Sequence, residues 1–460
     1  MNELLRKIAA VVGERAVLTG EDVRSRAAGW ARQDANEAGA IVRPASTAEL
    51  AEVLELCNTA GQAIVPLGGG TGLVDGAHAV AQEIQLSTER MTAIEELDIA
   101  GSTMTVQAGV PLQAAQDKAA EAGLALPVDF GARGSATIGG AVSTNAGGNA
   151  VIRYGMMREQ VLGLEAVLAD GTVVSSMNRM LKNNAGYDLK QLFIGTEGTL
   201  GIVTRIVLRL RPAMRSQSTA FVAIDNFGKI PALLKHCGGR LGGTMSAFEV
   251  MWSDFYDTIL CANPKHPAPV PQAFPFYVLI EATGGDQDSD QQRFEETLAA
   301  AMEDELVADA AIAGGGAQRN ALWEIRDDIE TLVKTLFPHI AFDISLPIGD
   351  ADTYVERVKD SLRARWPDVF RCVTFGHLGD SNIHFVMTIG DAAAEDRAAA
   401  MEIVYEALQP FGGSISAEHG IGLEKRPYLH CSRSDTELRL MRSLKNLLDP
   451  TGILNPGKVL

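Results

Sequence analysis

The glycine clusters of this sequence restrict its possible folds more than any other feature. The 460-residue chain contains 46 glycines, and many of them gather between residues 61 and 201. Glycine has no Cβ atom, so such clusters occur where a backbone must approach a ligand closely. The segment IVPLGGGTGL, residues 64–73, sets four glycines and a threonine between two apolar runs. Its backbone amides can turn inward together and form a nest for a diphosphate.

The spacing around this glycine segment excludes two familiar phosphate-binding motifs. No Lys-Ser/Thr pair follows it, as a Walker loop requires, and the GxGxxG spacing of a nicotinamide site is absent. An ordinary turn between two strands is the commoner explanation for such a segment taken alone. Two further glycine-rich segments, residues 127–155 and 193–206, favour ligand binding over an ordinary turn, because their glycines are spaced like the ends of strands. We therefore expect several backbone loops to converge on one extended ligand, longer than a mononucleotide.

The length and composition predict two or three domains that fold throughout. The sequence is 46% hydrophobic and 21% charged, which is ordinary globular usage. Residues 1–60 show helical periodicity with one short strand, and Ser46 to Glu49 form a capping-box pattern at the start of a helix. β-rich runs then alternate with glycine clusters as far as residue 213.

From this pattern we predict an α+β fold in three parts. Residues 1–213 form a ligand-binding domain whose β-rich runs include TIGGAVS, residues 137–143. Residues 214–409 form a second domain, built on a mixed sheet with helices on one side. Residues 410–460 form a C-terminal segment with a motif-bearing loop, a helix and a tail.

Charge and cysteine usage narrow the partners and the compartment. The formal net charge is −18, which disfavours nucleic acid and anionic lipid because Lys and Arg hold such partners. The five cysteines are far apart and form no CxxC pair, so neither a disulfide framework nor a zinc or iron–sulfur motif is indicated. The N-terminal pattern is wrong for a signal peptide, and nothing approaches the roughly 18 apolar residues of a membrane span. We expect a cytoplasmic protein, with a homodimer as the default assembly.

Three of the eight histidines fall in two blocks of the C-terminal third, TFGHLGDSNIHFVM and SISAEHGIGLEKR. A turn over residues 379–382 separates two β-like runs, so His377 and His384 can face each other from adjacent strands. Two imidazoles placed in this way suit a divalent metal. In the second block, Glu418 and His419 would point to opposite faces of an extended stretch, one toward the metal and one toward a substrate. Two histidines and one carboxylate, with an open position, are typical of a catalytic metal site.

An isolated histidine pair is more often a pair of ordinary hydrogen-bonded side chains. Two observations favour the metal site here. An aspartate and an asparagine lie between His377 and His384, where they can orient the ligands. Gly420 and Gly422 follow the Glu-His dipeptide and leave room for a ligand.

Four blocks in this order, PLGGGTGL, TIGGAVSTNAGG, LFIGTEGTLGIVT and LNPGK, resemble the vanillyl-alcohol-oxidase or PCMH type of FAD flavoprotein. The resemblance extends over essentially the whole chain. It implies a two-part FAD-binding domain, a cap domain over the flavin ring and a C-terminal segment that returns to the flavin. Thr71 stands in the region where some relatives carry a flavin-linked histidine, and no cysteine lies near Tyr154, so we expect non-covalent FAD.

The resemblance also implies which residues bind the cofactor, with residues 68–72 cradling the diphosphate. The full set of expected FAD-binding residues is Pro66, Gly68, Gly69, Gly70, Thr71, Gly72, Pro127, Gly134, Thr137, Gly139, Gly140, Thr144, Asn145, Gly147, Gly148, Tyr154, Gly155, Glu197, Gly198, Gly201, Ile202 and Asn455.

The blocks GHLGDSNIH and AEHGIG resemble the metal and base motifs of the D-2-hydroxyglutarate and D-lactate dehydrogenase branch. On this likeness His377, His384 and Glu418 hold zinc or a similar ion, and His419 is the general base. The metal then polarises the 2-hydroxyl group of a D-2-hydroxy acid while hydride leaves C2 for flavin N5.

Arg326 lies where this branch carries its substrate arginine, and a planar guanidinium suits a carboxylate. The alternative is a surface helix residue in a local ion pair with Asp327 or Asp328.

Three positions depart from the 2-hydroxyglutarate pattern. Glu330, Ala341 and Val386 stand where those enzymes carry Thr, Lys and Asn, so donors for a second carboxylate are missing. Both D-lactate-like and D-2-hydroxyglutarate-like substrates therefore stay open. The branch makes a transfer flavoprotein, a quinone or a cytochrome the candidate electron acceptor. The alternative functions are an oxygen-using FAD oxidase of the same fold, and a nicotinamide dehydrogenase or nucleotide-binding subunit without catalysis.

Overall fold

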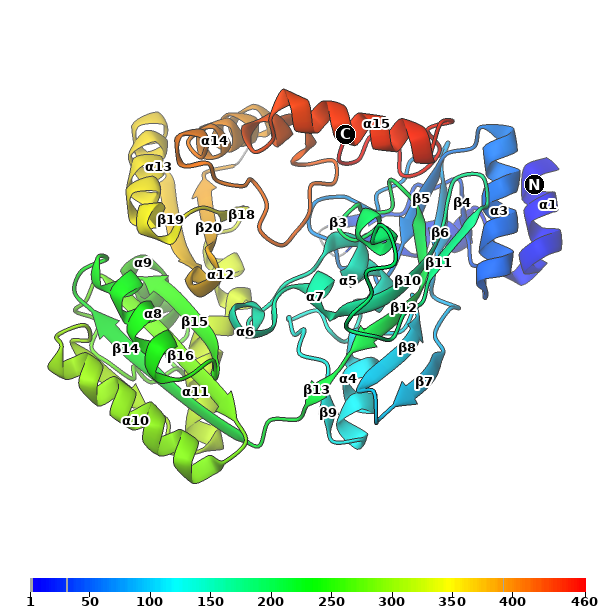
Figure 1. Ribbon diagram of the computed structural model, residues 1–460. Helices are drawn as coiled ribbons and strands as arrows, with labels where there is room; N and C mark the ends of the chain where they lie inside the picture. The colour runs from blue at the N-terminus through cyan, green and yellow to red at the C-terminus, as the bar shows by residue number, and fades with distance from the viewer. Residues whose placement is uncertain (1–2, 30–31, 392) are drawn as a thin grey trace. The chain divides into compact units, whose positions relative to one another are not determined.

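A computed structural model describes residues 3–29, 32–391 and 393–460. The chain forms two compact units (Figure 1). Unit 1 consists of Met1–Gly148, Gly155–Ala213 and Glu418–Leu460, and unit 2 of Asn149–Tyr154 and Met214–Ala417. Each unit is thus assembled from separate stretches of the sequence.

Unit 1 contains two main sheets. The first has the strand order β1-β4-β6-β5, with β4, β6 and β5 parallel and β1 antiparallel to β4. The second is antiparallel, in the order β11-β10-β12-β8-β7. The strands are β1 (Val17–Leu18), β2 (Ala27–Gly29), β3 (Arg32–Ala35), β4 (Ala40–Val42), β5 (Ile64–Leu67), β6 (Ile84–Ser87), β7 (Ile94–Asp98), β8 (Thr103–Gln107), β9 (Leu124–Ala125), β10 (Val161–Val167), β11 (Val173–Ser176), β12 (Ile202–Arg209) and β13 (Arg211–Pro212).

Each sheet of unit 1 has its own hydrophobic core. The core at the first sheet buries Leu50 and Leu54 of one helix and also takes in Ile453 and Leu454 from the end of the chain. The helices of unit 1 are α1 (Glu3–Val12), α2 (Glu21–Arg24), α3 (Thr47–Ala60), α4 (Leu112–Glu121), α5 (Ile138–Thr144), α7 (Met157–Gln160) and α15 (Asp435–Leu448). A fold with two sheets, each packed on buried apolar side chains, agrees with the expected two-part domain.

Two local predictions in unit 1 need correction. The run TIGGAVS is helix α5 rather than a strand, because the Thr137 side chain accepts a hydrogen bond from the Gly140 amide and caps the helix. The capping box at the start of α3 forms only in half. The Ser46 hydroxyl accepts from the Glu49 amide, whereas the Glu49 carboxylate accepts from the amide of Ala45.

Unit 2 is built on one seven-stranded sheet in the order β17-β14-β16-β15-β19-β20-β18. Every pairing within it is antiparallel, so the prediction of a mixed sheet was wrong. The strands are β14 (Ser216–Ile224), β15 (Met245–Trp252), β16 (Phe276–Gly284), β17 (Asp309–Ile312), β18 (Ile340–Ser345), β19 (Phe370–Gly376) and β20 (Asn382–Ile389).

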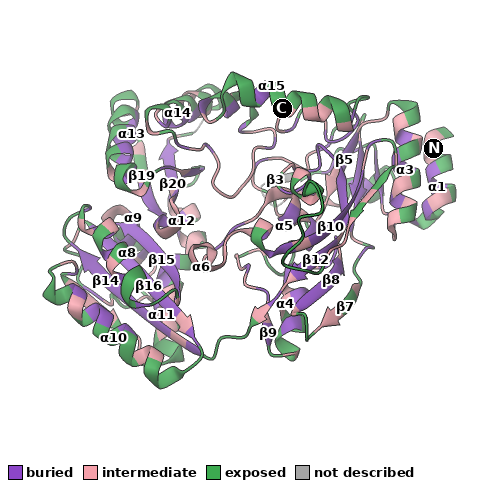
Figure 2. Ribbon diagram, in the orientation of Figure 1, coloured by how far each residue is buried: buried purple, intermediate pink, exposed green. Residues whose placement is uncertain are grey.

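Helices cover both faces of this sheet, not one face as predicted. All eight residues of β15 are buried (Figure 2), although neighbouring side chains of a strand point to opposite faces. In Figure 1, α8 and α10 lie in front of these strands, while α9 and α11 lie behind them. The helices are α6 (Val151–Tyr154), α8 (Lys229–Arg240), α9 (Ser253–Ala262), α10 (Gln287–Glu303), α11 (Gly316–Asp327), α12 (Ile329–Thr335), α13 (Ala351–Arg365) and α14 (Ala394–Glu406). Among the described residues, no helix has the length and apolarity needed to cross a bilayer.

Candidate functional site

The glycine segment after β5 divides into packing glycines and open glycines. A Cβ atom on Gly68 would lie 2.7 Å from the hydroxyl oxygen of Thr137, and one on Gly69 would lie 1.9 Å from the carbonyl oxygen of Ser135. These two glycines let two backbone segments touch. A Cβ on Gly70 or Gly72 would meet nothing within 4 Å. The second pair therefore leaves an open backbone surface, which fits the close approach of a diphosphate.

A small cavity lies beside these open glycines. Its lining includes Gly70, Gly72, Asp75 and His78. Sequence reasoning passed over His78, which follows the glycine segment by six residues. A histidine next to an expected phosphate loop is a signal that could have singled it out.

Glu197 joins the glycine-rich segments to the C-terminal segment inside unit 1. It has a φ of 53° and is buried, and its carboxylate accepts from the amides of Ile421 at 2.6 Å and Gly422 at 2.9 Å. Burial raises the pKa of this carboxyl group, partly offset by those two amide bonds. Glu197 thus holds the loop that follows His419.

Asn455 supplies a buried polar atom that fits a bound cofactor. Its side-chain NH2 group donates to the carbonyl oxygens of Gly76 at 3.1 Å and Glu197 at 2.7 Å. Its side-chain oxygen is buried and has no hydrogen-bond partner among the described residues. Together with the open glycines, this acceptor suits a group such as FAD, whose atoms would complete the site.

The remaining expected cofactor residues are distributed over both units. Tyr154 lies on α6 of unit 2, and all the others belong to unit 1. Gly139 packs against Ala108, since a Cβ there would lie 2.5 Å from that methyl group. It supports the start of α5 and does not present an open backbone.

Glu418 and His419 begin the C-terminal part of unit 1. The Glu418 carboxylate accepts a hydrogen bond of 2.8 Å from the amide of Gly148, and a Cβ on Gly147 would lie 2.4 Å from the same oxygen. Residues 417–419 form bends, so the alternation of an extended chain does not apply to this dipeptide.

His377 and His384 come together in unit 2. His384 lies on β20, and His377 follows the last residue of β19. Their ring centroids are 5.3 Å apart, with the planes at 84°, and each ring offers a nitrogen within 4.8 Å of one on the other ring. This donor pair fits a divalent cation.

A buried carboxylate stands behind His377. Glu249 of β15 accepts from His377 Nδ1 at 2.7 Å and from Arg326 Nε at 2.8 Å. Burial alone would raise the pKa of Glu249, but His377 and Arg326 hold it down at about 2. The carboxylate is therefore ionised at neutral pH.

Arg326 is buried on α11, with a 5% exposed side chain, rather than lying on the helix surface. It makes the local ion pair with Asp327 at 3.4 Å, while Asp328 instead caps α12 and pairs with His266 at 2.9 Å. The guanidinium stacks over Phe375 at 5.0 Å, and its Nη2 lies 3.4 Å from His377 Nε2. The arginine predicted to bind substrate and a histidine predicted to bind metal are thus neighbours within unit 2.

A second buried carboxylate, Asp343 of β18, connects strand β20, which carries His384, to Ala417, the residue before Glu418. It accepts from Asn382 at 2.6 Å and from the Ala417 amide at 3.2 Å, and it lies 3.9 Å from His384 Nδ1. Sequence reasoning missed both Asp343 and Glu249. The available signal was a single carboxylate inside an otherwise apolar strand, which is costly to bury without partners.

The three departures from the 2-hydroxyglutarate pattern lie on α12, β18 and β20. Glu330 is 79% exposed and pairs with Lys334, Ala341 is exposed, and Val386 belongs to a hydrophobic core. Ala341 and Val386 face each other across the β18–β20 pairing.

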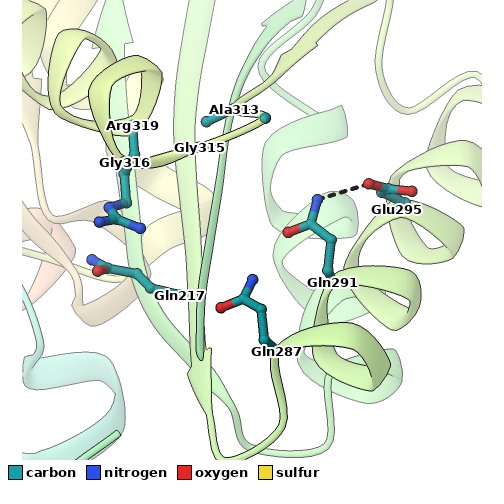
Figure 3. Close-up of a pocket in the computed structure, with 9 residues that line it drawn as sticks. Gln217, Gln287, Gln291, Glu295, Ala313, Gly315, Gly316 and Arg319 are labelled. Atoms are coloured by element: carbon teal, nitrogen blue, oxygen red, sulfur yellow. Dashed lines mark hydrogen bonds between the residues drawn. The ribbon is translucent and has the colours of Figure 1, made fainter. Parts of the chain in front are cut away.

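A larger cavity of unit 2, about 420 Å³, contains none of the predicted site residues (Figure 3). Gln217, Gln287, Gln291 and Arg319 line it between α10 and the glycine loop before α11. Its lining has no histidine and no cysteine.

Comparisons with known proteins show the family of this chain. Residues 213–459 match the family described as "FAD linked oxidases, C-terminal domain", and residues 38–176 match an FAD binding domain. The chain is 38% identical to the D-2-hydroxyglutarate dehydrogenase of Xanthomonas citri pv. viticola, covering 94% of this chain and 91% of the relative. It is also 38% identical to the mitochondrial D-2-hydroxyglutarate dehydrogenase of Bos taurus, covering 99% and 83%. A Schizosaccharomyces pombe protein provisionally named a mitochondrial D-lactate dehydrogenase is 34% identical, covering 93% and 83%.

Among solved structures, p-cresol methylhydroxylase with bound substrate matches with a TM-score of 0.77 and 15% identity, covering 100% of this chain and 96% of that one. Alkyldihydroxyacetonephosphate synthase matches with a TM-score of 0.75 and 17% identity, covering 99% and 86%. At such low identity these two likenesses show the fold alone, which is the PCMH-type fold expected from the sequence.

Proposed function

Because this chain belongs to the family of FAD-linked oxidases that includes the D-2-hydroxyglutarate dehydrogenases, it is an FAD-dependent enzyme that oxidises a D-2-hydroxy acid, and we propose that it does so with a divalent metal ion. The observation that carries the metal proposal is the histidine pair of unit 2, backed by Glu249 and placed beside buried Arg326. An imidazole whose Nδ1 is held by a carboxylate is typical of a metal ligand.

In this proposal each residue of the site has one role. His377, His384 and Glu418 hold the ion, which when bound polarises the substrate hydroxyl group. Arg326 binds the substrate carboxylate, for which its planar guanidinium is suited. An imidazole nitrogen of His419 takes the proton of the 2-hydroxyl group. FAD, when bound, supplies the redox chemistry by accepting hydride from C2.

We propose that FAD is held without a covalent bond, over the open backbone of Gly70 and Gly72 and against Asn455. The five free cysteines support a reducing compartment such as the cytoplasm, although two of the relatives described above are named as mitochondrial. The acceptor is a transfer flavoprotein, a quinone or a cytochrome, and the protomers pair as a homodimer.

For the substrate we propose a D-2-hydroxy acid of the D-lactate or D-2-hydroxyglutarate type. Ala341 offers no donor and Val386 is apolar, which favours a substrate without a second carboxylate. The exposed Glu330 pairs with Lys334 and gives no support to a dicarboxylate.

Dye-coupled turnover of the purified protein on a panel of D- and L-2-hydroxy acids, with and without chelator, tests these proposals. We expect bleaching of the flavin absorbance by D-lactate or D-2-hydroxyglutarate, abolished by chelator and by His419→Ala. His430→Ala is the matched control, since His430 is an exposed histidine of the same C-terminal segment. Turnover that is indifferent to chelator would exclude the metal. Peroxide formation in air without dye would instead identify an oxidase.

A further inference from the structure

Glu249 has two partners that the proposed function assigns to different tasks. One carboxylate oxygen accepts from the ring of His377 at 2.7 Å, and the other accepts from Arg326 at 2.8 Å. The side chain is 1% exposed, so no solvent competes for either oxygen. A single carboxylate therefore joins a proposed metal ligand to the proposed substrate arginine.

The bond to His377 fixes which ring nitrogen is available. When Nδ1 donates its proton to Glu249, the lone pair of a neutral imidazole lies on Nε2. The Arg326 Nη2 group, which can only donate, lies 3.4 Å from that Nε2, which is consistent with an acceptor there. The ring thus carries its lone pair on Nε2, and not on Nδ1, and a cation bound there would take the place of the contact with Arg326.

The bond to Arg326 fixes the guanidinium in the same way. It uses Nε, and Phe375 supports the plane of the group at 5.0 Å. Nη1 and Nη2 carry the remaining donors; Nη1 also pairs with Asp327 at 3.4 Å, and Nη2 is the one next to His377. A carboxylate held by these donors lies close to a cation held by His377 Nε2.

We propose that Glu249 is a positioning residue that sets the metal ligand His377 and the substrate arginine Arg326 from one buried carboxylate, so that metal affinity and substrate affinity depend on the same side chain. This inference rests on the proposed metal-assisted function. It predicts that one substitution, at a residue that touches neither the substrate nor the metal, weakens the binding of both.

The test compares Glu249→Gln with Glu281→Gln in the full-length FAD-loaded enzyme. Glu281 is the matched control because it is a buried glutamate on the neighbouring strand β16, where it accepts from Trp323 at 2.8 Å and Thr219 at 3.0 Å. Neither of these partners has a role in the proposed chemistry. Glu249→Asp, which keeps the charge on a shorter side chain, serves as the conservative variant.

Three quantities are measured on each variant: the dissociation constant for Zn²⁺ and Co²⁺ by chelator competition, the KM and kcat for the best D-2-hydroxy acid, and the melting temperature. For Glu249→Gln we expect the metal dissociation constant to rise about tenfold or more. The KM should rise about tenfold as well, because the single amide oxygen of glutamine cannot accept from both His377 and Arg326. Glu281→Gln should lower the melting temperature without changing either constant, and Glu249→Asp should recover part of both.

A metal dissociation constant and a KM within twofold of the wild type in Glu249→Gln would overturn the inference while leaving the proposed function intact. Equal losses in Glu281→Gln would overturn it too, because they would show a general effect of disturbing the sheet. A wild-type enzyme that binds neither Zn²⁺ nor Co²⁺ and ignores chelator would overturn the metal-assisted function, and the metal half of this inference with it.

Discussion

Replacing Arg326 by methionine separates its structural role from its proposed role in binding substrate. Methionine keeps much of the length of the arginine side chain but removes the charge, and so leaves the buried Glu249 with His377 as its remaining hydrogen-bond partner. Breaking a buried ion pair in this way costs about 3–5 kcal/mol. Because the His377 ring still donates to one oxygen of the carboxylate, we expect the lower end, about 3 kcal/mol, and a melting temperature lower by roughly 10 °C.

The same substitution removes the charged donors proposed to hold the substrate carboxylate. Hydrogen bonds to charged groups contribute about 1.5–3 kcal/mol, so kcat/KM should fall by about tenfold to about 150-fold. Steady-state kinetics with a dye acceptor measures this change at a temperature well below the melting point of the variant. FAD content is measured on the same sample, since loss of flavin would lower the rate for another reason.

Arg319→Met is the matched control. Arg319 lies on the same helix, α11, and its side chain makes no hydrogen bond or ion pair with the described residues. Its loss should change stability by no more than about 0.5 kcal/mol and leave kcat/KM unaltered. If Arg326→Met matched this control in both stability and kcat/KM, neither the buried ion pair nor the substrate role of Arg326 would stand.

Three further perturbations test other parts of the structure. Gly69→Ala should lose bound FAD and melt at a lower temperature, because its Cβ would lie 1.9 Å from the Ser135 carbonyl oxygen. Gly72→Ala has open space around its Cβ and should keep the fold. Flavin absorbance and thermal melts compare the two variants. Asp343→Asn should lower the free energy of unfolding, measured in urea, by about 1–3 kcal/mol. The amide of asparagine has one acceptor oxygen, so either the Ala417 amide or the Asn382 side chain would lose its partner. A decrease below about 0.5 kcal/mol would contradict this network. Acid precipitation should release all the flavin into the supernatant, and yellow colour retained in the pellet would point to a covalent link, for which His78 beside the open glycines is the first residue to replace.

The sequence predicted the elements whose pattern is local. Apolar runs such as Ile202–Arg209 and Phe276–Gly284 are strands as expected, because strong β-forming residues and flanking turns leave little competition. Residues 137–143 were predicted as a strand because they contain two glycines and several β-branched residues. They form a helix instead, because the Thr137 side chain caps its N-terminus. Strand direction in unit 2 was beyond the pattern, since it depends on pairings between distant segments such as β15 with β19.

The candidate site divides in the same manner. His377 and His384 lie seven residues apart around one turn, so their proximity follows from the local chain. The partners that orient them come from elsewhere, because Glu249 precedes His377 by 128 residues in sequence. Only the fold brings such residues together. In the sequence, the one signal for them is a single carboxylate within an apolar strand.

The path of the chain through unit 1 has a consequence for synthesis in the cell. The amide of Ile64 donates to the carbonyl oxygen of Ile453, and the amide of Asn455 donates back to the carbonyl oxygen of Ile64. Strand β5 and the glycine loop behind it thus gain their final neighbours only after residue 455 has left the ribosome. Unit 2 needs little beyond residues 214–417, apart from the short stretch 149–154, and can complete its core earlier. The FAD-binding unit therefore completes its fold only after residue 455 has been synthesised, and a premature stop near residue 450 should yield a protein that folds its second unit yet never retains flavin.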